Sequence, residues 1–164
     1  MTGSNTALSS ETPQTRCLLV LLLVAAACLA CSGVRAPVPA VNEPHYLAKA
    51  RHFVDPDWCS GDFFLSSANP HLVFYSLVGP LTHVFPFGTV AWIGRVLSLL
   101  LLASGWVALV TRLVPGRWAA WHATCLFLLM AATGNLSGEW VVGGFESKGL
   151  AYGCLLWSAA SAID

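Results

Sequence analysis

Long apolar blocks separated by short polar segments are the main pattern along this chain. The first block, residues 17–34, contains no charged residue and is long enough for a membrane-spanning helix, which needs about 20 apolar residues. Further apolar blocks follow at residues 89–110, 118–133 and 150–163. The pattern predicts an all-α fold, a polytopic transmembrane helix bundle with about four spans.

Two of the apolar segments have a second interpretation. Residues 17–34 follow Arg16 and could be a cleaved secretory signal, although the length of the run and the blocks after it favour an uncleaved anchor. Residues 71–88 are apolar but contain His71, His83 and two prolines. They could form a broken span or a helix lying at the membrane interface, and the number of crossings depends on which is correct.

The polar segments predict the domain organisation. Residues 1–16 are expected to be a disordered cytoplasmic tail. Residues 35–70 are expected to be one large extracytoplasmic loop with a short helix at 46–53, for which Asn42 is a candidate N-cap. Residues 71–164 make up the remaining transmembrane region. Because its last apolar block stops at the chain end without a polar tail, we expect a truncated piece of a longer polytopic protein.

Basic residues in short loops predict the orientation in the membrane. Arg112 and Arg117 crowd a tight loop, and Arg16 precedes the first span, so all three are expected on the cytoplasmic side. The segments 35–70 and 134–149 would then lie together on the opposite side. The bias is incomplete, because four basic residues fall on that outer side: Arg35, Lys49, Arg51 and Lys148.

Composition supports a membrane protein and excludes other classes. Hydrophobic residues make up 56% of the 164 residues and charged residues only 10%, against about 25% charged residues in an average soluble domain. The formal net charge is zero, so the lipid bilayer, and no nucleic acid, is the expected partner. Of the six cysteines only Cys59 lies in a polar segment, which argues against a disulfide framework.

The first polar loop holds the strongest candidates for chemistry. Glu43, His45 and Tyr46 place a carboxylate, an imidazole and a phenol just beyond the first span, and Asp62 follows later in the loop. A carboxylate near the membrane face can act as a general base on a hydroxyl acceptor, or can hold a divalent cation that binds a phosphate. The alternative is a solvated loop whose acids only keep it hydrated. No metal ligands are assigned, because the histidines lack a metal-binding spacing.

A second polar loop and one charge inside a span complete the candidates. The glycine-rich segment 143–149 carries Glu146 and Lys148, where Lys148 could meet a phosphate and Glu146 could pair with it or with an acceptor. A flexible turn with a local ion pair is the alternative. Arg95 lies inside the span 89–110, where a charge is expected to face a protein interior or a cavity, or to extend outward to the membrane surface.

These residues resemble the start of a known enzyme family. A first span, an outer loop that opens with an acid near a tyrosine, and the helical segment YLAKARHF are similar to the N-terminal part of GT-C-type membrane glycosyltransferases, such as protein mannosyltransferases and aminoarabinose transferases. The family often has an Asp-Glu pair where this chain has Asn42-Glu43. The segment WCSGDFF is also similar to large bacterial membrane proteins of unassigned function.

The resemblance implies a sugar transfer from a polyprenyl-phosphate donor at the outer face of a bacterial inner membrane, with Glu43 as the catalytic acid of the first outer loop. The remaining candidates are then expected to bind substrate: His45, Tyr46, Asp62, Arg95, Glu146 and Lys148. A transporter subunit with Arg95 lining a path, and a non-catalytic anchor or scaffold, remain as alternatives. Two acid-bearing loops on one side favour the enzyme, and a single ionisable residue within a span disfavours a proton-coupled transporter.

Overall fold

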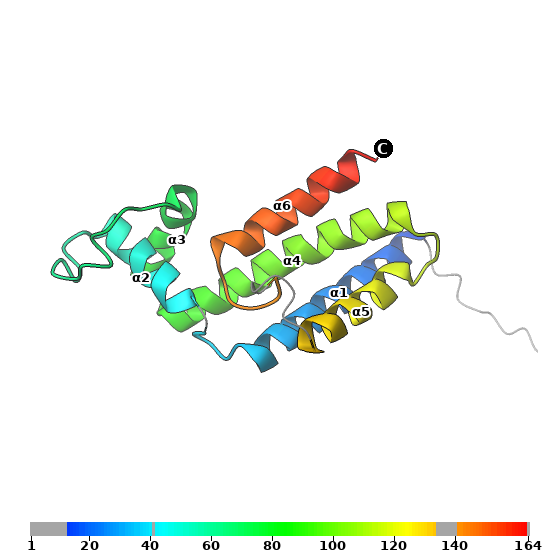
Figure 1. Cartoon of the computed structure of the whole chain (residues 1–164), viewed down its shortest axis with the longest axis horizontal. Coiled ribbons are helices and arrows are strands. Elements are labelled where there is room, and N and C mark those ends of the chain that lie inside the picture. The colour runs from blue at the N-terminus through cyan, green and yellow to red at the C-terminus, as the bar shows by residue number, and fades with distance from the viewer. Residues whose placement is uncertain (1–12, 41, 134–140, 164) are drawn as a thin grey trace, which may run out of the picture.

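The computed structural model describes residues 13–40, 42–133 and 141–163, and within them every regular element is a helix (Figure 1). The prediction of an all-α fold is therefore confirmed for the described part of the chain. The helices are α1 (Pro13–Arg35), α2 (Glu43–Val54), α3 (Leu72–Val84), α4 (Phe87–Leu113), α5 (Ala119–Thr133) and α6 (Ser147–Ser161).

Two of these helices are long and apolar enough to cross a membrane, α1 over Gln14–Arg35 and α4 over its whole length. At a rise of 1.5 Å per residue, α4 is about 40 Å long, whereas α5 and α6, with 15 residues each, reach only about 22 Å. The predicted bundle is thus confirmed in its coarser form, as an all-helical protein with two candidate spanning helices. A count of about four spans is not.

The ambiguous segment 71–88 is divided by a proline. Helix α3 ends at Val84, Phe85 has an extended backbone, and Pro86 precedes the first residue of α4. A residue before proline is disfavoured in helical conformation, which explains why α3 and α4 do not merge. With 13 residues, α3 is a short helix and not a full span. The segment 71–88 is thus a short apolar helix followed by the start of α4, and its placement as a broken span or as an interfacial helix stays a prediction.

The first helix starts earlier than its apolar run. Residues 13–16 were expected in the disordered tail but are helical and belong to α1, which ends at Arg35. Polar residues such as Gln14 and Thr15 continue a helix readily once the apolar run behind them has formed it, because extending a helix is easier than starting one. The rest of the predicted tail, residues 1–12, lies outside the described residues.

The helices form two packed groups that meet at α4. In the first, α1, α4, α5 and α6 surround a core that includes Val24, Cys28, Leu102 and Val107. In the second, α2 and α3 pack on each other and on the start of α4, with Leu47, Ala50 and Val78 among the buried residues. Figure 1 shows α2 and α3 projecting beyond one end of the long helices.

Glycines bring α6 close to α4. A Cβ atom built on Gly153 would lie 2.6 Å from Leu101 Cγ, and one on Gly105 would lie 2.9 Å from Leu156 Cβ. Small residues at such contacts are typical of helices that associate within membranes, since lipid gives little hydrophobic drive and close backbone packing replaces it. Gly153 of α6 and Gly105 of α4 therefore serve helix packing, whereas Gly149 of the predicted loop makes no close approach, since its Cβ would lie 3.8 Å from Ser98 Cβ.

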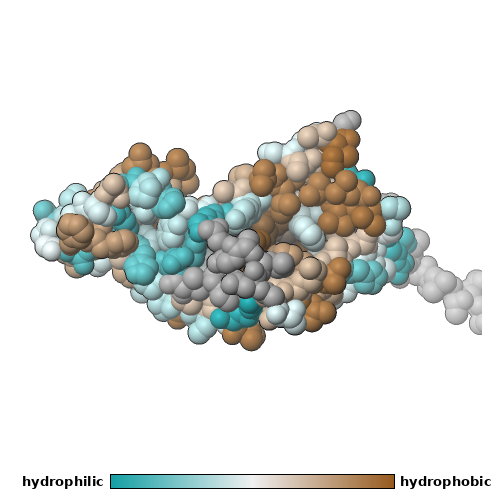
Figure 2. All heavy atoms as spheres, viewed as in Figure 1, coloured by the Kyte–Doolittle hydropathy of each residue, from teal (hydrophilic) through white to brown (hydrophobic). Residues whose placement is uncertain are grey.

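Apolar side chains cover the outward faces of the long helices. Leu22 on α1, Leu126 and Leu129 on α5, and Leu155 on α6 are all exposed. Figure 2 shows hydrophobic atoms gathered over α6 and the neighbouring helix ends, whereas hydrophilic and hydrophobic atoms are mixed around α2 and α3. Large exposed apolar surfaces mark contact with a membrane or a partner. Leu22 lies on α1, one of the two helices that are long enough to span, and this exposed apolar surface agrees with a membrane protein.

Two arginines that lie together at one end of the long helices yield a test of orientation. Arg16 of α1 and Arg117 line one small depression at one end, whereas Ser32 at the other end of α1 contacts Gly143. If the end with Arg16 and Arg117 is cytoplasmic, Cys59 is on the outer side. We expect a membrane-impermeant maleimide to label Cys59 in intact cells, with Cys59→Ser as the control. Labelling of Cys59 only after lysis would indicate the opposite orientation in the membrane.

Candidate functional site

A buried ion pair joins the segment after α1 to the interior of α4. Arg95 Nε and Nη2 donate hydrogen bonds to Glu43 Oε1 and Oε2, both at 2.6 Å. Neither side chain is exposed. Glu43 is the first residue of α2, and Arg95 lies about two turns into α4. This two-point geometry is the strongest form of an arginine–carboxylate pair. It confirms that Arg95 faces the protein interior.

The Glu43 carboxylate accepts four hydrogen bonds in all. Besides the two from Arg95, the Ala40 amide donates to Oε2 at 2.9 Å and the Phe145 amide donates to Oε1 at 2.5 Å. The backbone passes so close at Gly144 that a Cβ atom there would lie 2.9 Å from Glu43 Cγ. A carboxylate has about four lone-pair positions, and all are used here. Glu43 therefore holds three segments together, and its role as a catalytic base stays a prediction.

Arg95 is held from its other side by the end of α1. Its Nη1 donates to the Ala36 carbonyl at 2.5 Å and to Ser32 Oγ at 3.3 Å. Ser32 Oγ in turn donates to the Gly143 carbonyl at 2.6 Å. Arg95 and Ser32 thus link the end of α1, the start of α2 and the segment around Gly143.

The charge on Glu43 is stabilised in spite of its burial. Burial raises the pKa of the carboxyl group, but the hydrogen bonds from Arg95, Ala40 and Phe145, together with the charge of Arg95, outweigh it and hold the pKa below its ordinary value. Glu43 is therefore ionised at neutral pH, and a proton acceptor with a lowered pKa is a weak base.

This pKa predicts how stability depends on pH. Because the folded-state pKa of Glu43 is lowered, its contribution is fully present above the unfolded-state value of about 4.3 and is lost as the pH falls through the folded-state value. We expect the thermal unfolding midpoint in detergent to fall between about pH 5 and pH 3. Glu43→Gln should flatten this slope, whereas Asp57→Asn, at an exposed acid, should keep it. Equal slopes in all three proteins would contradict the prediction.

A second polar cluster lies where α2, α3 and α6 meet. The Tyr46 hydroxyl lies 3.2 Å from His71 Nε2, and the Ser147 hydroxyl lies 3.3 Å from His71 Nδ1. The tautomer of His71 decides which atom donates in each contact. The rings of Tyr46 and His71 are 5.0 Å apart between centroids. His71 therefore connects residues of three helices, and its two nitrogens are both engaged by hydroxyl groups.

An open pocket of about 290 Å³ adjoins this cluster. Lys49 on its wall donates to the Phe64 and Ser67 carbonyls, at 3.0 and 3.2 Å, and to Ser67 Oγ at 2.6 Å. All three donors of the Lys49 ammonium group thus bind the loop around Phe64 and Ser67, which forms one side of the pocket. His45 lies edge-on against the Phe64 ring, with centroids 5.4 Å apart. The lining is His45, Tyr46, Lys49, Phe64, Ser67, Ala68, Pro70, His71 and Tyr75.

The predicted substrate-binding residues are only partly brought together. His45 and Tyr46 line the pocket, but Arg95 belongs to the buried pair. Asp62 Oδ1 accepts a hydrogen bond from the Leu65 amide at 2.9 Å and so stabilises its own turn. Glu146 is buried and directly follows Phe145, whose amide contacts Glu43.

The second polar loop is shorter than predicted. Lys148 lies in the first turn of α6, because the helix begins at Ser147 and not after Gly149. Residues 134–140 of the predicted loop lie outside the described residues. Among the residues that the structure describes, no group of three or more His, Cys, Asp or Glu side chains could hold a metal ion.

The sequence did not point to three residues of this region: Lys49, His71 and Ser147. Their contacts join positions 18, 25 and 76 residues apart along the chain, so no local spacing could reveal them. The Asn69-Pro70 pair is a local turn signal just before His71, which is the N-cap residue of α3, but it says nothing of the partners of His71.

Comparison with known proteins identifies no relative of this chain. No protein-family model, no curated protein and no solved structure matches the chain. The function is therefore inferred from the site and from the helices that hold it.

Proposed function

We propose that the chain is part of a polytopic GT-C-type membrane glycosyltransferase that transfers a sugar from a polyprenyl-phosphate donor at the outer face of a bacterial inner membrane. The observation that carries the proposal is the open pocket, with Tyr46, Lys49 and His71 in its largely apolar wall, at one end of two candidate spanning helices. A lipid-linked donor presents its phosphate just beyond the hydrocarbon region. A pocket in this position is where such a head group would lie. In the complete assembly α5 and α6 would supply two further crossings.

The groups that face the pocket suit a sugar and a hydroxyl acceptor. The His71 imidazole can take a proton from an acceptor hydroxyl group that replaces Tyr46 at Nε2, while Ser147 keeps its contact with Nδ1. The half-exposed ring of Phe64 offers an apolar surface to a sugar ring, and Lys49 supplies a positive charge to the wall. Glu43 is then a positioning residue, since it anchors the first turn of α2, which carries Tyr46 and Lys49 one and two turns later.

A photo-crosslinking experiment tests the proposal. Membranes containing the chain are irradiated with a polyprenyl-phosphate sugar that carries a photoreactive group on the sugar. We expect labelling of peptides around His71 that excess polyprenyl phosphate suppresses. His71→Ala should reduce the labelling about tenfold, as expected for the loss of one or two pocket contacts. His83→Ala, an exposed histidine on the same helix, is the matched control and should have no effect.

If the wild-type chain shows no labelling that polyprenyl phosphate suppresses, the polyprenyl-phosphate sugar is rejected as its ligand. That result would favour the second candidate, a non-catalytic membrane anchor. The observation in favour of that candidate is the complete use of the Glu43 acceptors, which leaves the acid without a lone pair for a reacting hydroxyl group. In an anchor, His71 only ties α2 and α3 to α6, so that His71→Ala would lower the thermal unfolding midpoint and change nothing else.

A further inference from the structure

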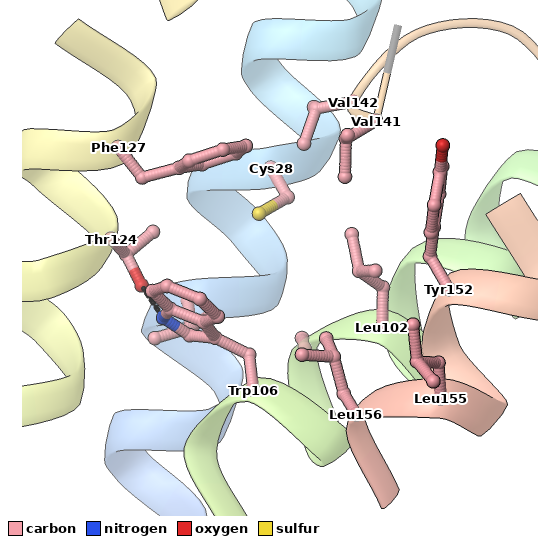
Figure 3. A pocket seen from close by; sticks show the side chains of 12 residues that line it. Cys28, Leu102, Trp106, Thr124, Phe127, Val141, Val142, Tyr152, Leu155 and Leu156 are labelled. Atoms are coloured by element: carbon pink, nitrogen blue, oxygen red, sulfur yellow. Dashed lines mark hydrogen bonds between the residues drawn. The ribbon is translucent and has the colours of Figure 1, made fainter. Parts of the chain in front are cut away.

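An apolar cavity lies between α1, α4, α5 and α6, apart from the open pocket (Figure 3). Its volume is about 140 Å³. Figure 3 shows Cys28, Trp106 and Phe127 around the space, with the Cys28 sulfur directed into it and the Tyr152 hydroxyl directed away from its centre. The polar groups of the wall have partners, because Trp106 Nε1 donates to Thr124 Oγ1 at 2.9 Å. The cavity therefore offers a ligand only apolar contacts.

The cavity lies at the depth of the hydrocarbon region. Val24 is near the midpoint of the candidate span Gln14–Arg35, and Leu102 is near the midpoint of α4. Leu155 lines the cavity and is also 63% exposed, so the cavity reaches the outer surface on the side of α6. That surface is part of the apolar cover of the long helices. The opening therefore faces lipid when these helices span a membrane.

We propose that this cavity binds a segment of the acyl chain of a membrane phospholipid. A dry cavity of about 150 Å³ lined by aliphatic and aromatic residues can take up benzene, so this one has room for several methylene groups. Water is excluded by the apolar lining, and an empty cavity leaves its walls without contact partners. Acyl chains are the hydrocarbon that surrounds a spanning helix at the highest concentration. The proposal does not depend on sugar transfer.

The absence of a polar contact in the cavity decides which part of the lipid enters. A head group would have to leave water without gaining a hydrogen bond, which is costly. The mid-chain methylenes are thus held, and the head group stays at the membrane surface. An acyl segment there would contact Trp106 and Phe127 on the side of α5 and Leu156 on the side of α6. It would connect α5 with α6, which lie on opposite sides of the α1–α4 pair in Figure 1.

A photoreactive phospholipid tests the proposal. The full chain is reconstituted in nanodiscs of phosphatidylethanolamine and phosphatidylglycerol that contain a phospholipid with a mid-chain diazirine. We expect adducts on peptides that carry Cys28 and Trp106. Ala103→Phe, at a buried wall position, should reduce these adducts about tenfold, because the ring fills the volume that the chain would occupy. Ala151→Phe, on the exposed face of α6, is the matched control and should leave them unchanged.

A second, smaller cavity-filling substitution controls for misfolding of the first variant. Cys28→Leu adds less volume than Ala103→Phe and should also lower the adduct yield, and thermal unfolding in the same nanodiscs shows whether each variant is folded. Unchanged adducts in a folded cavity-filling variant would overturn the proposal. So would adducts confined to exposed residues such as Leu126. Displacement of the phospholipid label by an equimolar amount of polyprenyl phosphate would overturn the acyl assignment in favour of an isoprenoid chain.

Discussion

Arg95→Met should lower the free energy of unfolding by about 3–5 kcal/mol, the usual loss when one partner of a buried ion pair is removed. The substitution leaves the Glu43 carboxylate fully buried without its counter-ion and keeps only the Ala40 and Phe145 amides as donors. Denaturant unfolding in detergent, followed by tryptophan fluorescence, measures the loss. Arg112→Met, on the exposed end of the same helix, is the matched control and should change the free energy by less than about 0.5 kcal/mol.

The double variant Glu43→Gln with Arg95→Met separates charge from packing. It removes both buried charges, so it should recover much of the stability that Arg95→Met loses, since a charged pair can often be replaced by neutral groups at small cost. Losses that simply add in the double variant would show that the two side chains do not interact in the folded protein. That outcome would contradict a stabilising ion pair between α2 and α4.

The buried pair also changes what Glu43→Gln is expected to do. The acid–base role predicted for Glu43 implies an unchanged fold and a turnover lower by about 10²–10⁴-fold. The contacts of Glu43 instead imply that Glu43→Gln destabilises the protein, since Arg95 then lies buried opposite a neutral amide. Measuring the folded fraction beside turnover distinguishes the two. A large loss of turnover at equal folded amount would support the catalytic role.

Gly79→Ala should separate α3 from α2. A Cβ atom at this position would lie 2.6 Å from the Ala50 carbonyl oxygen and 2.7 Å from Val54 Cγ1. Because one of these atoms belongs to the backbone of α2, the clash cannot be relieved by a side-chain rotation. We expect a loss of about 1–3 kcal/mol, the usual range for overpacking, reduced by less than about 1 kcal/mol through the better helix propensity of alanine.

Gly88→Ala is the matched control for Gly79→Ala. It places the same methyl group in the first turns of α4, where no atom lies within 4 Å of the new Cβ, so it should be neutral or should stabilise by up to about 1 kcal/mol. Both variants are compared by thermal unfolding in detergent. A Gly79→Ala protein as stable as Gly88→Ala would contradict the close packing of α2 on α3, and with it the shape of the open pocket.

Local physical chemistry was enough to predict an all-helical chain and the approximate positions of α1, α2, α4 and α5. An uncharged run as long as residues 17–34 has to satisfy its backbone hydrogen bonds internally, and it forms α1. Asn42 and Pro44 predicted the start of α2 to within one turn, although the Asn42 side chain makes no capping hydrogen bond and the Glu43 carboxylate binds the Ala40 amide. The glycines of 143–149 predicted a loop, but packing against α4 extends α6 back to Ser147.

Only the tertiary structure decided what the polar residues do. Glu43 and Arg95 were both identified from the sequence, but their pairing spans 52 positions and depends on how α2 docks on α4. No local sequence pattern links His71 to Tyr46 or Ser147. These contacts form only because α2, α3 and α6 are brought together by packing. Hydrophobic periodicity and length act along one helix and can be read from the chain. Ion pairs, pockets and cavities arise between helices, and their geometry is set by packing.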